Sequence, residues 1–434
     1  AVAMLAAPLI FRLYSLSPAE GIDVDLFRRV GTTLTRIFLL QILFYGLTGV
    51  ANAYLNSRRR FFAAAWSPIL PNLIIVASLL SLPNAGDRTW QIGEVLTDSR
   101  LRLTLGLGAT LGIAAMAAVV VPAMFQAGLR FRPVFEWRHP VVRKLLVLSG
   151  WTIGFVGANQ VALVVVRNLA RGQADGIATA YFYAFTFFVL PHGLLAVSIA
   201  TTFQPEMARA VSARDKPRFL HHSSLGVRMI ALLTFPAAAA LIVLAKPVIA
   251  LMQRGQFDPD DVHHTSRALA GLAIGLVGFS VYLFALRGFY AHQDTRTPFV
   301  LNVFENLLNV VLAVILVQRW GVLGLGLAYG LAYLVAAVWA LKVLSYKVPG
   351  FPLREIWSST WRMLLAAVLM AQAMWFVTHD VVRDNGIDGL AQLIVGGGVG
   401  AVVYAAVLIA LGSPEVTAVR ALVAGRRRAA PASG

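Results

Sequence analysis

The chain has 434 residues, of which 58 % are hydrophobic and only 13 % are charged, and its mean hydropathy is +0.73. Soluble domains are nearer to half apolar and a quarter charged, so this composition excludes an ordinary soluble fold and indicates lipid as the main solvent. The net charge of +17 would suggest a nucleic-acid partner in a soluble protein; here it indicates basic cytoplasmic loops, and we expect no nucleic acid to bind.

Twelve apolar segments are candidates to cross the ~30 Å hydrocarbon core as helices. In chain order they are 1–16, 32–55, 66–83, 101–126, 145–170, 176–202, 227–252, 262–291, 298–318, 321–345, 357–379 and 387–411. They predict an all-α, polytopic membrane protein. The first segment begins in mid-hydrophobic sequence without a basic flank, so we expect a helix whose chain continues upstream, not a signal peptide.

The basic residues of the loops predict the orientation. One set of alternate loops, including Arg58–Arg60, Arg130–Lys144 and Arg209–Arg228, holds most of the loop Lys and Arg. The other set holds most of the loop acids. Because basic loops stay in the cytoplasm, this bias predicts that the first set and the C-terminus are cytoplasmic.

Two predicted hairpins resemble each other, which indicates an internal repeat. In Tyr54–Pro68 and in Tyr290–Pro298, a helix ends near a Tyr, a basic turn follows, and Pro begins the next helix. Many transporters are built from such repeats, with the site between the halves. We therefore expect two pseudo-symmetric lobes around a central cavity. The predicted parts are an N-lobe over 1–126, a basic amphipathic linker over 127–144, a C-lobe over 145–345, two extra helices over 346–411 and a basic tail over 412–434.

One predicted helix carries an unusual row of polar residues. Asn302, Glu305, Asn306 and Asn309 follow the spacing i, i+3, i+4 and i+7, so they share one face. Polar residues inside a span are costly and are candidates for function. The face predicts either a polar cavity wall or a cation site on the Glu305 carboxylate, with interhelical hydrogen bonding as the alternative.

Three arginines lie inside spans or near their ends and are candidates for binding an anion. Arg167 follows three valines, Arg287 lies inside its span, and Arg36 lies near an outer end. A guanidinium suits phosphate, although snorkelling to the interface also explains Arg167. Asn159 and Gln160 lie mid-span and fit either a cavity or packing.

Pro191 and Gly193 predict a break in the span 176–202. Such a break suits a hinge for alternating access, and passive kinking is the alternative. No Walker loop, HExxH or GxSxG motif is present, and no Cys is available as nucleophile or ligand, so we expect a non-enzyme and assign no metal site.

Four blocks of sequence resemble the MurJ/MviN family. They are Leu55–Asn72, Ala184–Val197, Arg254–Asp258 and Gly288–Pro298, of which the last is the most specific. Their order and spacing cover essentially the whole chain, and the Ala-, Arg- and Val-rich style is typical of an actinobacterial member. The resemblance implies a fourteen-helix flippase of the MATE-like superfamily. Its first two helices would then lie upstream of residue 1.

The resemblance also implies a substrate and a mechanism. Family members move lipid II, the lipid-linked peptidoglycan precursor, from the inner to the outer leaflet of the bacterial cytoplasmic membrane by alternating access. Arg167, with Arg287 and Arg36, would hold the diphosphate, and the apolar spans 357–411 would shelter the polyprenyl tail. Where many members have an acidic residue before Arg167, this chain has Val166, which leaves Glu305 as the carboxylate for Na⁺ or proton coupling.

Other functions stay open at the level of sequence. They are a flippase for another polyprenyl-linked oligosaccharide, a cation-coupled drug antiporter, and a non-transporting scaffold that recruits cell-wall enzymes. The expected partners are lipid II and membrane lipids, with cell-wall synthesis or division proteins as further candidates. No cofactor is expected.

Overall fold

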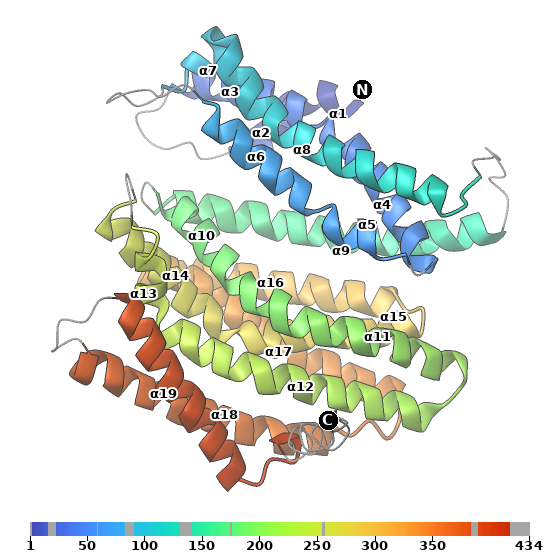
Figure 1. Cartoon of the computed structure of the whole chain (residues 1–434), viewed down its shortest axis with the longest axis vertical. Helices are drawn as coiled ribbons and strands as arrows, with labels where there is room; N and C mark the ends of the chain where they lie inside the picture. Colours follow the sequence, from blue (N-terminus) through green and yellow to red (C-terminus); the bar gives the residue numbers. More distant parts are fainter. Residues whose placement is uncertain are drawn as a thin grey trace, which may run out of the picture. The chain divides into compact units, whose positions relative to one another are not determined.

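The computed structural model describes residues 2–15, 23–58, 60–82, 91–130, 140–173, 176–253, 257–382 and 389–416. Within these ranges the regular structure is entirely helical, as the sequence predicts. The chain divides into two compact units, Ala1–Arg138 and His139–Gly434, and the helices of each are labelled in Figure 1. The division falls inside the predicted linker 127–144; most of that linker, and the predicted tail from 417 onward, lie outside the described residues.

The first unit is built around one long helix. Its elements are α1 (Val2–Leu5), α2 (Ala7–Tyr14), α3 (Val24–Phe38), α4 (Gln41–Ser57), α5 (Phe62–Trp66), α6 (Ile69–Leu80), α7 (Glu94–Thr97) and α8 (Ser99–Gln126). The long helix α8 packs against α3, α4 and α6. Close approach depends on small residues: a Cβ on Gly112 would lie 2.8 Å from Pro71 Cα.

The second unit is a larger bundle. Its elements are α9 (Pro140–Arg171), α10 (Ile177–Pro191), η1 (His192–Ala196), α11 (Val197–Ser212), α12 (Lys216–Val243), α13 (Ala245–Ala250), α14 (Pro259–Ile274), α15 (Leu276–Ala291), α16 (Arg296–Trp320), α17 (Val322–Lys347), α18 (Leu353–Phe376), η2 (Val377–Val382) and α19 (Gly389–Ala410). The centre is α17, which packs against α14, α15 and α16. A Cβ on Gly275 would lie 2.2 Å from Gly330 Cα, so only glycine permits this contact between helix backbones.

Membrane spans match the sequence prediction closely, with one exception. Among the described residues, ten helices are long and apolar enough to cross a membrane, and a pair bent by 49° at Gly275, α14 with α15, makes up to eleven. The predicted first segment, 1–16, instead forms the two short helices α1 and α2, interrupted at Ala6 just before Pro8. Several spans also begin earlier than predicted, and the difference is largest for two: α3 takes in Arg28 and Arg29, and α12 begins at Lys216.

The predicted break at Pro191 and Gly193 is a widened turn. The helix continues from α10 into α11 through η1, a π-helical turn that starts directly after Pro191. Proline removes a backbone donor, and a π-turn is one way to accommodate that loss without ending the helix. The α-helical hydrogen-bond pattern is therefore interrupted at the predicted place, although the span itself continues, and the role of this turn as a hinge stays a prediction.

Candidate functional site

Three asparagines join α9 to α16. Asn306 Nδ2 donates to Asn159 Oδ1 over 3.2 Å, and Asn302 Nδ2 donates to the same oxygen over 3.3 Å. Asn159 Nδ2 in turn donates to Asn302 Oδ1 over 3.4 Å. Asn302 is fully buried and Asn306 is 8 % exposed, so the amides satisfy one another where water is scarce.

Glu305 lies buried on the same face of α16, and among the described residues it has no ion-pair partner, although the Tyr333 side chain approaches it. It is 1 % exposed, and within the described part of the chain neither carboxylate oxygen has a hydrogen-bond partner of acceptable geometry. The Oδ1 atom of Asn309, one turn later, is also without a partner. Burying an isolated charged carboxylate costs free energy. A bound proton or a small cation, which prefers oxygen ligands, would remove that cost, so the site fits either one.

Tyrosines surround this carboxylate. Tyr181, Tyr282, Tyr329 and Tyr333 interact electrostatically with Glu305. The ring centroids of Tyr329 and Tyr333 are 4.7 Å apart, and those of Tyr282 and Tyr333 are 5.4 Å apart. None of these tyrosines was predicted from the sequence as a site residue. The available signal was Tyr329 and Tyr333, spaced by four on one face of the span 321–345.

A cavity of about 320 Å³ opens beside this cluster. Its lining includes Arg167 and Asn159 from α9, Asn306 and Asn309 from α16, and Tyr329 from α17. Arg167 is half-buried, so its positive charge is partly withdrawn from solvent. The structure therefore brings a guanidinium, several amides and a phenol to one cavity wall, which can hold a polar anionic group.

The other predicted residues lie elsewhere. Gln160 is exposed on α9 and is not part of the cavity lining. Arg287 on α15 donates from Nη1 to Gln204 Oε1 on α11 over 2.6 Å. Arg36 lies in the first unit, where it lines a different cavity. Arg167 and Arg287 thus do not form one clamp, because α9 and α15 present them to different neighbours.

An apolar groove of about 450 Å³ runs along α12, α15, α17 and α18. Trp357, Leu364 and Val368 of α18 line it, opposite Phe235 and Val281, and its one hydroxyl belongs to Thr360. The sequence predicted a groove over 357–411. Of that predicted segment, only α18 lines the groove, because α19 packs against α18 and contributes no lining residue.

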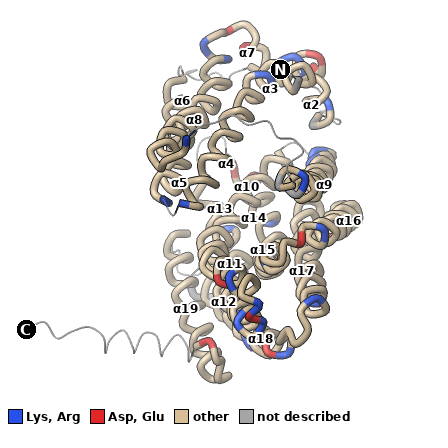
Figure 2. Tube along the Cα trace, turned by 90° about the vertical axis from the view of Figure 1, so that its right-hand side faces the viewer, with Lys and Arg blue, Asp and Glu red and all other residues tan. Residues whose placement is uncertain are grey.

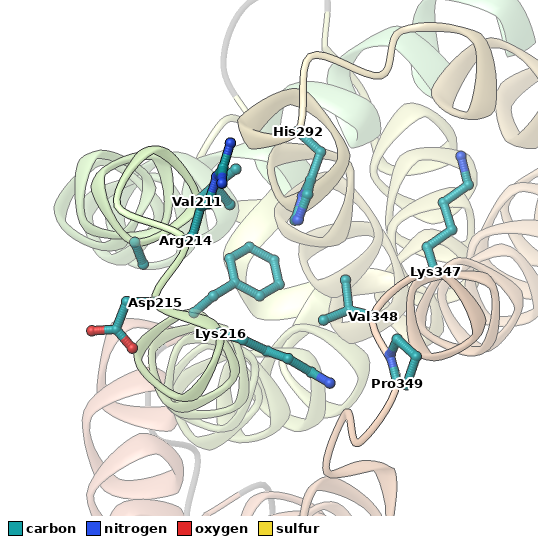
Figure 3. Close-up of a pocket in the computed structure, with 10 residues that line it drawn as sticks. Val211, Arg214, Asp215, Lys216, His292, Lys347, Val348 and Pro349 are labelled. Atoms are coloured by element: carbon teal, nitrogen blue, oxygen red, sulfur yellow. The ribbon is translucent and has the colours of Figure 1, made fainter.

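A smaller cavity of about 270 Å³ lies at the ends of α11, α12, α15 and α17, and Figure 3 shows its lining. None of the predicted site residues belongs to it. Lys347 donates to Asp294 Oδ2 and, over 2.6 Å, to Thr297 Oγ1, which ties the end of α17 to the turn before α16. Burial alone would raise the pKa of Asp294, but the hydrogen bonds from Lys347 and Thr297 hold it below its ordinary value. The residues at this edge of the cavity therefore have a structural role, because they hold the end of α17 against the turn before α16.

Comparisons with known proteins agree with one another. The family model described as "Lipid II flippase MurJ" matches residues 1–395. The "Probable lipid II flippase MurJ" of Vibrio cholerae serotype O1 is 26 % identical over 387 residues, covering 88 % of this chain and 71 % of that protein.

Solved structures show the same fold. The structure "Lipid II flippase MurJ, inward closed conformation" aligns with a TM-score of 0.71 and 22 % identity, covering 94 % of this chain and 80 % of that one. A MATE transporter in complex with MaL6 aligns with a TM-score of 0.62 and 13 % identity, over 79 % and 75 % of the two chains. At these identities the likeness concerns the fold alone.

Proposed function

We propose a function for this chain from one premise: it belongs to the lipid II flippase MurJ family. The chain is a multi-span membrane transporter, not an enzyme, and it flips lipid II. The match of the family model to residues 1–395 is the observation that carries this conclusion. We assign it to the bacterial cytoplasmic membrane, where lipid II must pass from the inner to the outer leaflet, and alternating access is the mechanism that suits this fold.

The polar head group of a lipid-linked precursor is the part that is hardest to move across the membrane. A diphosphate with its sugars and peptide cannot enter ~30 Å of hydrocarbon without a polar shelter. The cavity lined by Arg167, Asn159, Asn306 and Asn309 supports such a shelter. The donor fork of Arg167 would hold the diphosphate, and the amides would accept and donate hydrogen bonds to the head group.

The lipid tail needs the opposite environment. The groove along α12, α15, α17 and α18 is almost wholly apolar and is large enough for a section of a hydrocarbon chain. A tail lying there would exchange one apolar surrounding for another, at little cost in free energy. We therefore assign the tail to this groove, with α18 as one of its walls.

We assign cation coupling of transport to Glu305. Among the described residues it has no ion-pair partner, the Tyr333 side chain is the polar group that approaches it, and no second carboxylate acts on it. A proton or Na⁺ would neutralise it, with Asn309 Oδ1 as a further oxygen ligand for Na⁺. Binding and release of that cation would change the charge next to the Arg167 cavity, where Asn309 also lies.

The orientation follows from the loop charges, which favour a cytoplasmic C-terminus. The absence of native Cys permits a direct test with single cysteines. Ser212→Cys, exposed at the end of α11, should be protected from a membrane-impermeant maleimide in intact cells. Gln91→Cys, exposed in an alternate loop, should be labelled. The reverse pattern would overturn the orientation.

The function is tested in cells whose own lipid II flippase is depleted. The full-length protein should restore growth and restore lipid II that is accessible at the outer leaflet. Arg167→Ala should lose both, whereas Arg171→Ala, one turn away on α9 and outside the cavity lining, should retain them. Restored growth without a change in accessible lipid II would favour the scaffold alternative. Export of a different polyprenyl-linked oligosaccharide would identify that substrate instead.

A further inference from the structure

Four arginines line one cavity in the first unit. Arg28, Arg29 and Arg36 come from α3, and Arg12 comes from α2. Thr32 and Thr33 of α3 also line this arginine cavity, whose volume is about 570 Å³. Figure 2 shows the basic segments on α2 and α3. Of the four, only Arg36 was predicted from the sequence as a site residue.

The local sequence explains why the three α3 arginines share a face. Polar residues recur along α3 at three- and four-residue steps, which places them on one face of the helix. In order they are Asp25, Arg28 or Arg29, Thr32 or Thr33, and Arg36. The opposite face of α3 is apolar and packs into the cluster of Val30, Val95 and Leu101. Burying that face leaves the polar face of α3 directed into the cavity.

An aromatic contact brings Arg12 to the same place. Phe11 of α2 packs against Phe27 of α3, with ring centroids 5.3 Å apart. Gly31 lies directly under the Phe11 ring, where a Cβ would come within 2.0 Å of its Cζ atom. Glycine therefore lets α2 approach α3 closely, and Arg12, the next residue after Phe11, reaches the cavity.

The charges in this cavity do not balance. Asp25 is the only carboxylate among the described lining residues, against four guanidinium groups. The Nε atom of Arg28 is buried and finds no hydrogen-bond acceptor in the part of the chain that the structure describes. Clustered cations repel one another, and a buried donor without a partner is costly, so an anion would relieve both.

The membrane orientation adds an independent argument. Arg28 and Arg29 fall on the side to which the loop charges assign the acidic loops, opposite the basic set. Basic residues there act against the insertion preference of the chain. Arg28 and Arg29 therefore do not serve the membrane topology, and their position in one cavity indicates another role.

We propose that the arginine cavity binds a phosphate-bearing anion, a phosphate or diphosphate group. The planar forks of several arginines match tetrahedral phosphate oxygens, and threonine hydroxyls supplement them. A cavity of about 570 Å³ has room for a diphosphate group. The group belongs either to a lipid head group or to a soluble anion. This site lies in a different unit from the Arg167 cavity, and its existence does not rest on the proposed transport function.

The first arm of the test uses the full chain in detergent with inorganic pyrophosphate as the probe. Calorimetric titration in a phosphate-free buffer should show saturable binding. Arg28→Gln combined with Arg36→Gln should weaken it at least tenfold, while Arg100→Gln, an exposed arginine of the same unit outside the cavity, should leave it unchanged. Asp25→Asn should tighten binding severalfold, because it removes the one opposing charge. A general loss of folding cannot produce that gain.

The second arm identifies the source of the phosphate. The chain is placed in nanodiscs of phosphatidylcholine, with or without phosphatidylglycerol, and arginine modification by phenylglyoxal is mapped by mass spectrometry. Protection of Arg28 by phosphatidylglycerol supports a lipid head group, and protection by pyrophosphate alone supports a soluble anion. Absence of protection by both overturns the proposal. Equal protection of Arg29, which lines the same cavity and is kept in both variants, in Asp25→Asn and in the double arginine variant overturns it as well.

Discussion

Arg228 Nη1 on α12 lies 3.1 Å from Oε1 of Glu415, a residue 187 positions later in the chain. Glu415 is 2 % exposed and also accepts hydrogen bonds of 2.7 Å from Ser359 Oγ and from Ser413 Oγ. This buried ion pair fastens the segment after α19 to α12 and α18. Arg228 was predicted among the basic loop residues, whereas it is a residue of α12 with a specific partner.

Breaking this pair should destabilise the protein strongly. Arg228→Ala leaves the Glu415 carboxylate buried without its counter-charge, at a cost of about 3 kcal/mol. Arg218→Ala is the matched control, since its pair with Glu206 is exposed and is worth less than ~1 kcal/mol. Thermal unfolding in detergent measures both. Equal losses in the two variants would contradict the assignment.

The same pair predicts a dependence of stability on pH. Burial alone would raise the pKa of Glu415, but hydrogen bonds from Ser413 and Ser359 and the charge of Arg228 lower it below the ordinary value of 4.5. A depressed carboxyl pKa contributes stability that is present above the unfolded pKa and is lost as the pH falls through the folded pKa. The difference in Tm between the native protein and Glu415→Gln should be constant near neutral pH and should shrink below about pH 4.5. A difference that is unchanged on acidification would refute this account.

Loss of the hydrogen bonds that join Asn159 to Asn302 and Asn306 should lower both the stability of the protein and its transport of lipid II. Asn159→Leu removes the acceptor of two hydrogen bonds and leaves the amides of Asn302 and Asn306 without that partner, which costs about 1–3 kcal/mol. It also removes a polar group from the Arg167 cavity, so accessible lipid II should fall. Asn168→Leu is the control, because within the described part of the chain that amide donates inside α9, to Val164 O. We expect the Asn168 variant to transport normally in the same depleted cells.

Glu305 provides a separable test of coupling. Glu305→Gln keeps the side-chain size but removes the charge, so folding should be retained and Tm should not fall. Lipid II flipping in proteoliposomes, measured across pH and Na⁺ concentration, should lose its dependence on the coupling cation in this variant. The native dependence persisting in the variant would exclude Glu305 from the coupled step.

The sequence by itself determined the class of the protein and one face of its site. Long apolar segments must be helices in lipid, because a helix satisfies its backbone hydrogen bonds within the segment. The spacing of Asn302, Glu305, Asn306 and Asn309 placed them together, because 3.6 residues per turn is a local property. The structure agrees that the face is buried.

Only the tertiary structure decided which side chains meet across helices. Three such meetings depend on how helices rotate and pack against one another. They are the pairing of Asn159 with Asn306, the tyrosines around Glu305, and the approach of Arg12 to Arg28. That rotation is set by contacts such as Gly275 against Gly330 and Gly31 under Phe11, which join residues distant in the sequence. Local periodicity fixes which residues of one helix share a face, but it carries no information about which face of another helix lies opposite.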